Sequence, residues 1–334
     1  MKSTSVSVVI PVFNGQAVLK PLCAELEAVL NATGLPYEII LVNDGSPDGS
    51  WEVIKELVQP DRCVIGIELT RNYGQHNALL CGIRAAQYDV IVTMDDDLQH
   101  PPSEIPLLLA KLEEGHDVVY GVPRRERHGW WRDAGSMVTK IALFHIMGAK
   151  TARHVCAFRA FRTYLRDAFG AYQSPFVSID VLLSWATTRF AALPVRHEPR
   201  RIGKSNYNLR KLFLHALNMT TGFSTLPLKF ASITGFIFTF LGMLVFALVC
   251  GLYFLQGSSV HGFPFLASII AVFSGTQLFA LGIIGEYLAR MHFRIMDRPA
   301  FTVREKLLPV RAAGRFCLGR PFTVEGRKVD SPAA

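Results

Sequence analysis

The chain has 334 residues, of which 50% are hydrophobic and only 19% are charged, and its formal net charge is +8. Its mean hydropathy is positive, which fits a soluble domain joined to membrane segments better than a purely soluble enzyme. The excess of positive charge suits nucleic acid, anionic lipid or phosphorylated substrates. The chain starts with one lysine and then a predicted strand, so we expect no signal peptide.

Strand-like and helix-like segments alternate through the first third of the chain. Short apolar runs predict strands, and apolar residues at helical spacing predict helices between them. The predicted strands are residues 6–12, 37–42, 63–69, 89–94 and 117–121, and the predicted helices are residues 16–32, 51–58, 77–86 and 101–114. This alternation predicts an α/β domain with a mostly parallel sheet and right-handed crossovers.

The fourth predicted strand runs directly into three acids, Asp95, Asp96 and Asp97. Open α/β sheets bind their ligands at the carboxyl ends of the strands. Because side chains alternate along an extended segment, Asp95 and Asp97 are expected to point the same way. Two carboxylates on one side suit Mg²⁺ or Mn²⁺ held together with substrate phosphates. The alternative is a solvated acidic turn.

A second acid, Asp44, follows the second predicted strand. At the same sheet edge its carboxylate could accept hydrogen bonds from a base or ribose. The alternative is an Asx-turn with Gly45. The sequence has no G-x-G-x-x-G after the first strand and no Walker A motif, which argues against a dehydrogenase or a P-loop enzyme.

Two basic segments with interleaved apolar residues are candidates for the membrane interface. Residues 124–153 carry seven Lys or Arg residues together with Trp130 and Trp131, and residues 207–221 form a second such segment. The alternative for the first segment is a solvated helix packed on the domain. Both lie beside membrane segments and lack an aromatic stacking motif, so we expect no nucleic acid partner.

Two uncharged stretches, residues 230–257 and 262–285, predict a transmembrane hairpin. The connecting loop has no Lys or Arg, whereas basic residues flank the outer ends, so both chain ends are expected in the cytoplasm. The expected organisation is a cytosolic domain over residues 1–200, a juxtamembrane segment over 201–228, two spans over 229–290 and a basic cytosolic tail over 291–334. The expected location is the inner, cytoplasmic membrane, as a multi-pass protein.

Five further motifs follow one another in the chain. They are Pro11-Val12-Phe13-Asn14, Val42-Asn43-Asp44-Gly45-Ser46, Arg71-Asn72-Tyr73-Gly74-Gln75-His76, Asp95-Asp96-Asp97-Leu98-Gln99 with Pro101-Pro102, and Arg200-Arg201-Ile202-Gly203-Lys204-Ser205-Asn206-Tyr207. In this order they resemble the family 2 glycosyltransferases, in the subgroup that acts on polyprenyl phosphates. The resemblance extends from about residue 5 to residue 300, including the hairpin. It implies a GT-A fold, inversion at the anomeric carbon, a nucleotide-sugar donor and a polyprenyl phosphate acceptor. A homo-oligomer is also expected.

The resemblance also implies roles for individual residues. Asp95 and Asp97 would bracket the metal and the diphosphate, and Gln99 would lie near the donor sugar. The expected donor-binding residues are Pro11, Phe13, Asn14, Asp44, Asn72, His76, Asp95, Asp96 and Gln99. The expected acceptor or phosphate-binding residues are Arg200, Arg201, Ser205 and Tyr207. Arg200 offers a planar fork to phosphate oxygens, although Arg200 and Arg201 could instead be positive-inside charges near the bilayer.

Two positions depart from the family pattern. Gly15 stands where an acid usually follows Asn14, and Arg153 stands where the family often has an Asp three residues before Cys156. A phosphate monoester, with a second pKa near ~6, is largely dianionic at neutral pH and can attack without a strong base. The expected catalytic set is Asp97, Arg200, Arg153 as a phosphate ligand, and Asp180 as a possible replacement carboxylate. The alternative for Asp180 is an ordinary position on a helix surface.

Three other functions compete with this interpretation. A processive polysaccharide synthase needs more spans and a Gln-x-x-Arg-Trp motif, and neither is present. A nucleic-acid-binding module is disfavoured by the placement of the charge. The third is a catalytically impaired membrane protein that only binds a nucleotide sugar. It remains an alternative because Arg153 stands where the family often has an Asp.

Overall fold

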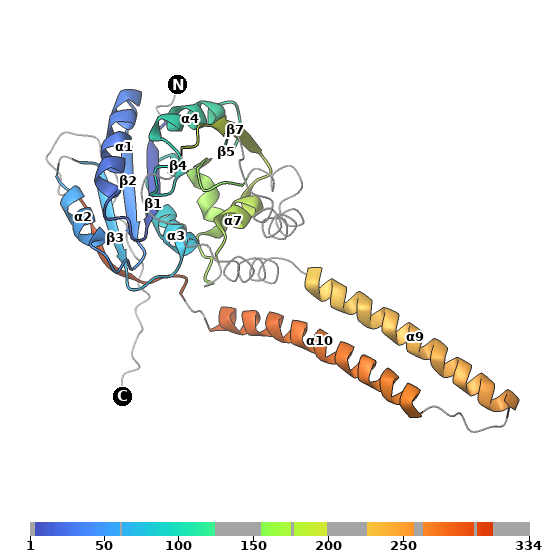
Figure 1. Ribbon diagram of the computed structural model, residues 1–334. Coiled ribbons are helices and arrows are strands. Elements are labelled where there is room, and N and C mark those ends of the chain that lie inside the picture. The colour runs from blue at the N-terminus through green and yellow to red at the C-terminus, as the bar shows by residue number, and fades with distance from the viewer. Residues whose placement is uncertain are drawn as a thin grey trace, which may run out of the picture.

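The computed structural model describes residues 4–60, 62–123, 155–174, 177–198, 226–256, 263–296 and 299–309. Its larger part is a three-layer α/β domain in which helices cover both faces of one sheet (Figure 1). Two long helices follow this domain in the chain and project away from it. The predicted α/β class is therefore confirmed.

The sheet of the described residues has the strand order β7-β5-β6-β4-β1-β2-β3-β8. The strands are β1 Val6–Val12, β2 Tyr37–Asn43, β3 Val64–Leu69, β4 Val90–Thr93, β5 Val118–Pro123, β6 Arg159–Arg162, β7 Phe190–Val195 and β8 Val303–Leu307. Strands β4, β1, β2 and β3 are parallel neighbours. Most of their residues are buried, which is typical of strands covered on both faces. Their carboxyl ends share one edge, as the sequence predicts.

The sequence does not predict how the strands in the other half of the sheet are arranged. Strand β6 lies antiparallel between β4 and β5, so the fifth predicted strand is not beside the fourth. Strand β7 is parallel to β5 and forms one edge. The sheet is therefore mixed, with its parallel core at the predicted ligand edge.

The helices divide between two hydrophobic cores. Helices α1 (Leu19–Thr33), α2 (Ser50–Leu57) and α4 (Ile105–Glu113) pack on one face, while α3 (Gln75–Ala85) and α7 (Ile179–Ala186) pack on the other. Two short 3₁₀ helices, Pro102–Glu104 and Thr163–Phe169, also occur in the described part of this domain. The bounds of α1 to α4 agree with the predicted helices to within a few residues.

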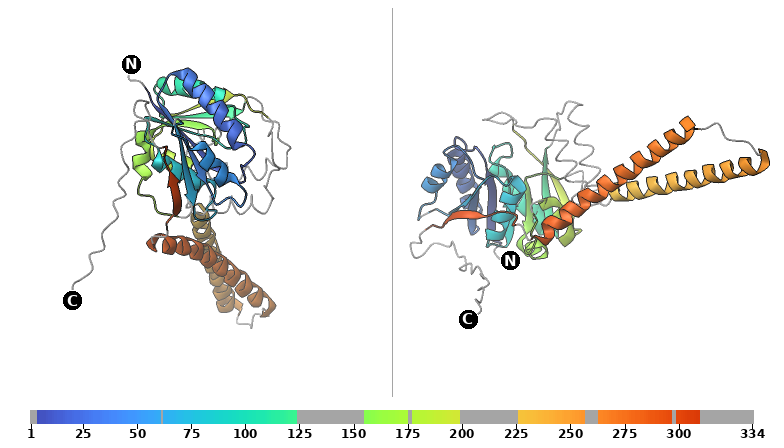
Figure 2. Two further views of the ribbon diagram at one scale, coloured as in Figure 1. Left: turned by 90° about the vertical axis from the view of Figure 1, so that its left-hand side faces the viewer. Right: turned by 90° about the horizontal axis from the view of Figure 1, so that it is seen from below.

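Helices α9 (Leu226–Gln256) and α10 (Phe263–Ile295) lie side by side and extend away from the domain (Figures 1 and 2). The Phe238 and Phe273 rings meet edge to face between them, with centroids 5.8 Å apart. Large apolar side chains are exposed along both helices, with Phe254 and Leu255 each at 85%. No helix in the described part of the chain combines the length with the apolar character that a membrane span requires.

Beyond α10 the chain returns to the domain as β8, antiparallel to β3. The Thr70 N–H, just past β3, donates to the Thr302 carbonyl at 3.0 Å. Arg304 donates to the Thr70 carbonyl at 3.3 Å and pairs with Glu68 at 3.6 Å. The strand after the long helices thus covers the edge next to the β3–α3 loop.

Candidate active site

The three acids lie in a turn and not on an extended strand. Strand β4 ends at Thr93, residues 96 and 97 are in a turn, and Leu98 has φ 58°. Asp97 is 9% exposed, and its Oδ1 accepts the Gln99 N–H at 3.1 Å. The strand alternation used to align Asp95 with Asp97 therefore does not apply, although both acids follow β4 at the expected edge.

Asp95 and Asp96 are partly buried and are each held by a neighbouring element. The Gln75 side-chain amide, at the start of α3, donates to Asp95 Oδ1 at 2.6 Å. Asp96 Oδ2 accepts the backbone N–H of Phe13, after β1, at 3.4 Å. The acidic turn is thus tied to two other segments of the same edge.

Gly15 lies directly against the Asp96 carboxylate. A Cβ at position 15 would lie 2.7 Å from Asp96 Oδ2, so the Asp96 carboxylate occupies space that a side chain at position 15 would need. The chain therefore places the Asp96 carboxylate against position 15, and this acid comes from the turn after β4 and not from the β1 loop.

The β1 loop is also tied to the loop after β2. The N–H groups of Asn14 and Gly15 donate to the hydroxyls of Ser46 and Ser50, at 3.2 and 3.0 Å. Asn14 has φ 57°, a left-handed conformation that Asn tolerates better than most residues. Phe13 remains 43% exposed at this edge.

Asp44 joins the β2 and β3 ends of the edge. It is 3% exposed, and its two oxygens accept the N–H groups of Tyr73 and Gly74 at 2.7 and 2.8 Å. Burial raises the pKa of Asp44 to about 6, against the lowering effect of these two hydrogen bonds. The Asx-type contact in this loop is made by Asn43, whose Oδ1 accepts the Ser46 N–H at 3.3 Å, so Asp44 is left to bridge the two loops.

The β3–α3 loop, residues 70–74, carries the predicted donor-binding Asn72. The Arg71 guanidinium lies 4.6 Å from the centroid of the Tyr73 ring, and the Tyr73 and Thr70 hydroxyls share a hydrogen bond of 2.9 Å. The predicted His76 is one residue into α3, and its Nδ1 accepts the Ile179 N–H at 3.4 Å. These contacts fix the loop whose backbone N–H groups bind Asp44.

An aromatic group adjoins Gln99. The His100 ring stacks on Phe158, with centroids 5.2 Å apart, and meets His197 at 5.0 Å. Burial, with a further contribution from His197, lowers the pKa of His100 to about 4, so its imidazole is neutral at neutral pH. The Gln99 carbonyl accepts the Glu198 N–H at 2.8 Å, which connects the acidic turn to the chain after β7.

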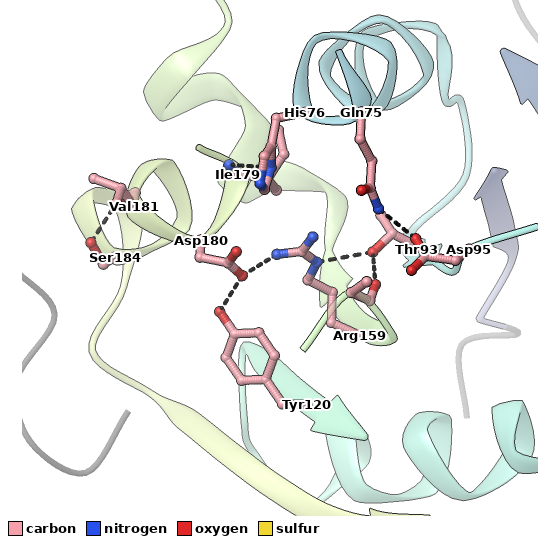
Figure 3. Close-up of polar contacts among 11 residues, drawn as sticks. Gln75, His76, Thr93, Asp95, Tyr120, Arg159, Ile179, Asp180, Val181 and Ser184 are labelled. Carbon is pink, nitrogen blue, oxygen red and sulfur yellow. Dashed lines mark hydrogen bonds and ion pairs between the residues drawn. The ribbon is translucent and has the colours of Figure 1, made fainter. Parts of the chain in front are cut away.

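Asp180 is buried, so the alternative that it occupies an ordinary position on a helix surface is wrong. It is 6% exposed and pairs with Arg159, which is 1% exposed (Figure 3). The Tyr120 hydroxyl donates to Asp180 at 3.0 Å, and burial raises the pKa of Tyr120 well above its ordinary value. Sequence reasoning missed Arg159 and Gln75. A clue to Arg159 was its place in the Cys156-Ala157-Phe158-Arg159 stretch.

The structure brings the predicted donor-site residues to one edge, because Pro11, Phe13, Asn14, Asp44, Asn72, His76, Asp95, Asp96, Asp97 and Gln99 all lie in or next to the ends of β1 to β4. The predicted Arg153, Arg200, Arg201, Ser205 and Tyr207 lie outside the described residues. The two basic segments, residues 124–153 and 207–221, also lie outside them.

The acidic turn fits a cation shared with a substrate. Among the described residues, no group of three or more His, Cys, Asp or Glu side chains is arranged to hold a metal ion. Asp95 and Asp97 supply only hard carboxylate oxygens, and Mg²⁺ is usually bound by one or two carboxylates together with phosphates and water. The donor set therefore suits Mg²⁺ or Mn²⁺ beside a diphosphate better than a closed metal cage.

Comparison with known proteins assigns this edge to an enzyme family. The family model described as "Glycosyl transferase family 2" matches residues 7–172. A chain from Serratia proteamaculans (strain 568), named undecaprenyl-phosphate 4-deoxy-4-formamido-L-arabinose transferase, is 34% identical over 90% of this chain and 93% of its own length. The chain belongs to glycosyltransferase family 2. It is therefore a glycosyltransferase, and its α/β domain is GT-A-like with a mostly parallel core.

A relative from a second organism agrees with this assignment. A chain of the same name from Pseudomonas paraeruginosa (strain DSM 24068 / PA7) is 35% identical, with 98% of each chain covered. Among solved structures, mannosyl-3-phosphoglycerate synthase from Rubrobacter xylanophilus is 18% identical over 65% of this chain and 72% of its own, with a TM-score of 0.49. Because the Pseudomonas chain matches over 98% of this chain, its similarity extends past the α/β domain into α9 and α10.

Proposed function

We propose that this glycosyltransferase moves a sugar, with inversion, from a nucleotide-sugar donor to a polyprenyl phosphate such as undecaprenyl phosphate. The observation that carries the proposal is the 34–35% identity to undecaprenyl-phosphate 4-deoxy-4-formamido-L-arabinose transferases over 90–98% of the chain. The product would be a polyprenyl-monophosphate sugar for modification of cell-envelope glycan or lipid. The same relatives make 4-deoxy-4-formamido-L-arabinose the first sugar to test.

The donor diphosphate would bind at the acidic turn. Asp95 and Asp97 would hold Mg²⁺ or Mn²⁺, and the cation would supply positive charge against the leaving diphosphate. Gln75 orients Asp95, and the Gln99 N–H orients Asp97. These two hydrogen bonds fix the carboxylates before a substrate arrives, which reduces the reorganisation needed during the reaction.

The nucleoside would bind across the ends of β1, β2 and β3. Asp44 is held by two backbone N–H groups, and each carboxylate oxygen has a further lone pair for a donor on the base or ribose. The exposed Phe13 ring offers an apolar surface for the base. His100 is neutral and lies next to Gln99, on the side where the donor sugar would extend.

The acceptor phosphate would attack as its own dianion, so no general base is required. Arg153, Arg200, Arg201, Ser205 and Tyr207 are proposed to bind this phosphate or the diphosphate. Guanidinium groups can make two parallel charge-assisted hydrogen bonds to phosphate oxygens. A homo-oligomer stays a prediction.

The membrane part of the proposal rests on the sequence. Residues 230–257 and 262–285 would form a hairpin in the inner membrane, with the catalytic domain and both chain ends in the cytoplasm. The apolar side chains exposed on α9 and α10 support this, but no described helix meets the requirements of a span, so the proposal needs its own test. A cysteine at Ser258 should react with an impermeant thiol reagent on intact cells. Labelling only after lysis would contradict the topology.

The transfer itself is tested by incubating membranes with a panel of radiolabelled nucleotide sugars, including the 4-deoxy-4-formamido-L-arabinose donor. We expect one donor to label the lipid fraction in a manner that requires added undecaprenyl phosphate and a divalent cation. Membranes without the protein are the control. If no donor labels lipid while the purified protein still binds a nucleotide, the catalytically impaired alternative is correct.

A further inference from the structure

A buried ion pair lies behind the acidic turn and has no role in the transfer described above. Arg159 is in β6, and Asp180 is in the first turn of α7. They are 1% and 6% exposed, and a buried charge is tolerated only when it is paired and hydrogen-bonded. Asp180 Oδ1 accepts hydrogen bonds from both the Arg159 guanidinium and the Tyr120 hydroxyl. The carboxylate is therefore held in one orientation between two donors.

The pair reaches the acidic turn through Thr93, the last residue of β4. Arg159 and Thr93 are paired across the antiparallel β4–β6 ladder. The Arg159 Nε donates to Thr93 Oγ1 at 2.9 Å, and the Thr93 hydroxyl donates to the Ala157 carbonyl at 2.8 Å. Thr93 is fully buried, so these bonds have no competition from water. These hydrogen bonds fix Thr93, which lies two residues before Asp95, the first of the three acids.

A second connection runs from the same turn of α7 to the other side of the acids. The N–H of Ile179, next to Asp180 in the chain, donates to His76 Nδ1 at 3.4 Å. His76 follows Gln75, which donates to Asp95 Oδ1 at 2.6 Å. Figure 3 shows the two connections converging on Asp95 and Thr93 from the α7 turn. Both connections start in the first turn of α7, one at the Asp180 carboxylate and the other at the Ile179 backbone N–H.

We infer that Asp180 and Arg159 are positioning residues that hold the turn of residues 94–99 in the geometry that binds a divalent cation and a diphosphate. This inference rests on the proposed function for the identity of the ligand. It differs from the hypothesis of Asp180 as a base, because a base must meet the acceptor, whereas this carboxylate is buried and directed at two protein donors. Neighbours that orient a metal ligand typically change metal affinity or activity by ~10- to 100-fold when they are removed.

The test uses a double variant that removes the ion pair without leaving a lone buried charge. In Arg159→Met with Asp180→Leu, an apolar pair replaces the ions, a change that is often neutral or stabilising in proteins. Ser184→Ala is the matched control, since Ser184 is on the same helix and its hydroxyl donates only to the Val181 carbonyl, at 2.7 Å. Full-length proteins are compared by thermal unfolding, by titration with Mn²⁺ and UDP, and by amide hydrogen exchange of peptides covering residues 94–99.

The expected result is a double variant that unfolds at or near the wild-type temperature, binds Mn²⁺ with UDP ~10- to 100-fold more weakly, and exchanges the amides of residues 94–99 faster. Ser184→Ala should match the wild type in all three. Wild-type exchange in the acidic turn of the double variant would overturn the inference, whatever the nucleotide affinity.

Kinetics separate positioning from base catalysis. The same double variant also removes the Asp180 carboxylate, and it does so without leaving Arg159 as a lone buried charge. A positioning role predicts a raised KM for the donor that falls as Mn²⁺ is increased, with much of kcat recovered. A loss of kcat at saturating donor and Mn²⁺, with normal Mn²⁺–UDP affinity, would instead identify a base. If the wild type never labels lipid, the proposed function fails, while hydrogen exchange in the ligand-free protein still decides the positioning role.

Discussion

Substituting Gly45 by alanine should weaken both the fold and the nucleotide site, because two effects act at this position. Gly45 has φ 62°, a left-handed conformation that costs a residue with a Cβ ~1–2 kcal/mol. A Cβ at position 45 would also lie 2.4 Å from the Arg71 carbonyl carbon and 2.6 Å from the Asn72 nitrogen. These are backbone atoms, so no side-chain rotation relieves the overlap.

The second effect reaches Asp44 through the β3–α3 loop. Ordinary contact begins near 3.4 Å, so the Arg71 backbone must retreat by about 1 Å for the new carbon to fit. The same loop supplies the two N–H groups that Asp44 accepts at 2.7 and 2.8 Å. A hydrogen bond to a charged group contributes ~1.5–3 kcal/mol. Losing one of these bonds, together with the backbone strain, should lower the free energy of unfolding by about 2.5–5 kcal/mol.

Gly34→Ala is the control for this experiment. Gly34 has φ 67°, but nothing lies within 4 Å of a Cβ built there, so it should show the strain alone. For a domain of this size, ~1 kcal/mol lowers Tm by about 2–4 °C, so the additional loss of ~1.5–3 kcal/mol should make Gly45→Ala unfold roughly 3–12 °C below Gly34→Ala. Thermal unfolding in detergent and titration with Mn²⁺–UDP measure the two effects. Equal Tm values for the two variants, with wild-type nucleotide affinity in Gly45→Ala, would refute the reasoning.

Three further predictions concern the same edge. Asp95→Asn and Asp97→Asn should each abolish transfer in a protein that still folds, and near-normal turnover that resists chelators would exclude the metal role. Because burial raises the pKa of Asp44 to about 6, nucleotide affinity should rise with pH through about 6 and should be flat in Asp44→Asn. The folded state binds this proton more tightly than the unfolded chain, so the free energy of unfolding should fall as pH rises from about 4 to about 6, as followed by urea titration. Gly15→Glu should weaken donor binding several-fold more than Gly15→Ala, because a second carboxylate would crowd Asp96. Tighter binding by Gly15→Glu would show instead that Asp96 does not substitute for the missing acid.

The parallel core was predictable because its strands are long apolar runs that are buried on both faces. Strands β6 and β8 carry no such signal. Strand β6 has four residues, two of them arginines, and β8 is Val303-Arg304-Glu305-Lys306-Leu307, which is mostly exposed. Their places depend on pairing with β4 and β3, and such long-range pairing is not visible in the local pattern.

The residues of the candidate site also divide into those that the sequence could assign and those that it could not. The acids and Asp44 could be assigned to one edge because each follows a predictable strand. Asp180 could not be assigned, because its partner Arg159 lies 21 residues away in the chain and Thr93 lies 66 residues from Arg159. The amphipathic pattern of a short helix does not reveal a buried ion pair, so the helix-surface alternative for Asp180 was natural and wrong.

The position of β8 at the edge of the sheet has a consequence for how the protein is made. Arg304 reaches Thr70 across 234 residues of sequence, and both long helices lie in between. At the usual ~5–20 residues per second, the ribosome needs roughly 10–50 s to deliver β8 after β3 has been synthesised. During this time the β3 edge has unpaired backbone groups, and such edges can pair with another chain. The nascent domain therefore depends on helices α9 and α10 leaving the ribosome promptly, since only then can its own strand close the sheet.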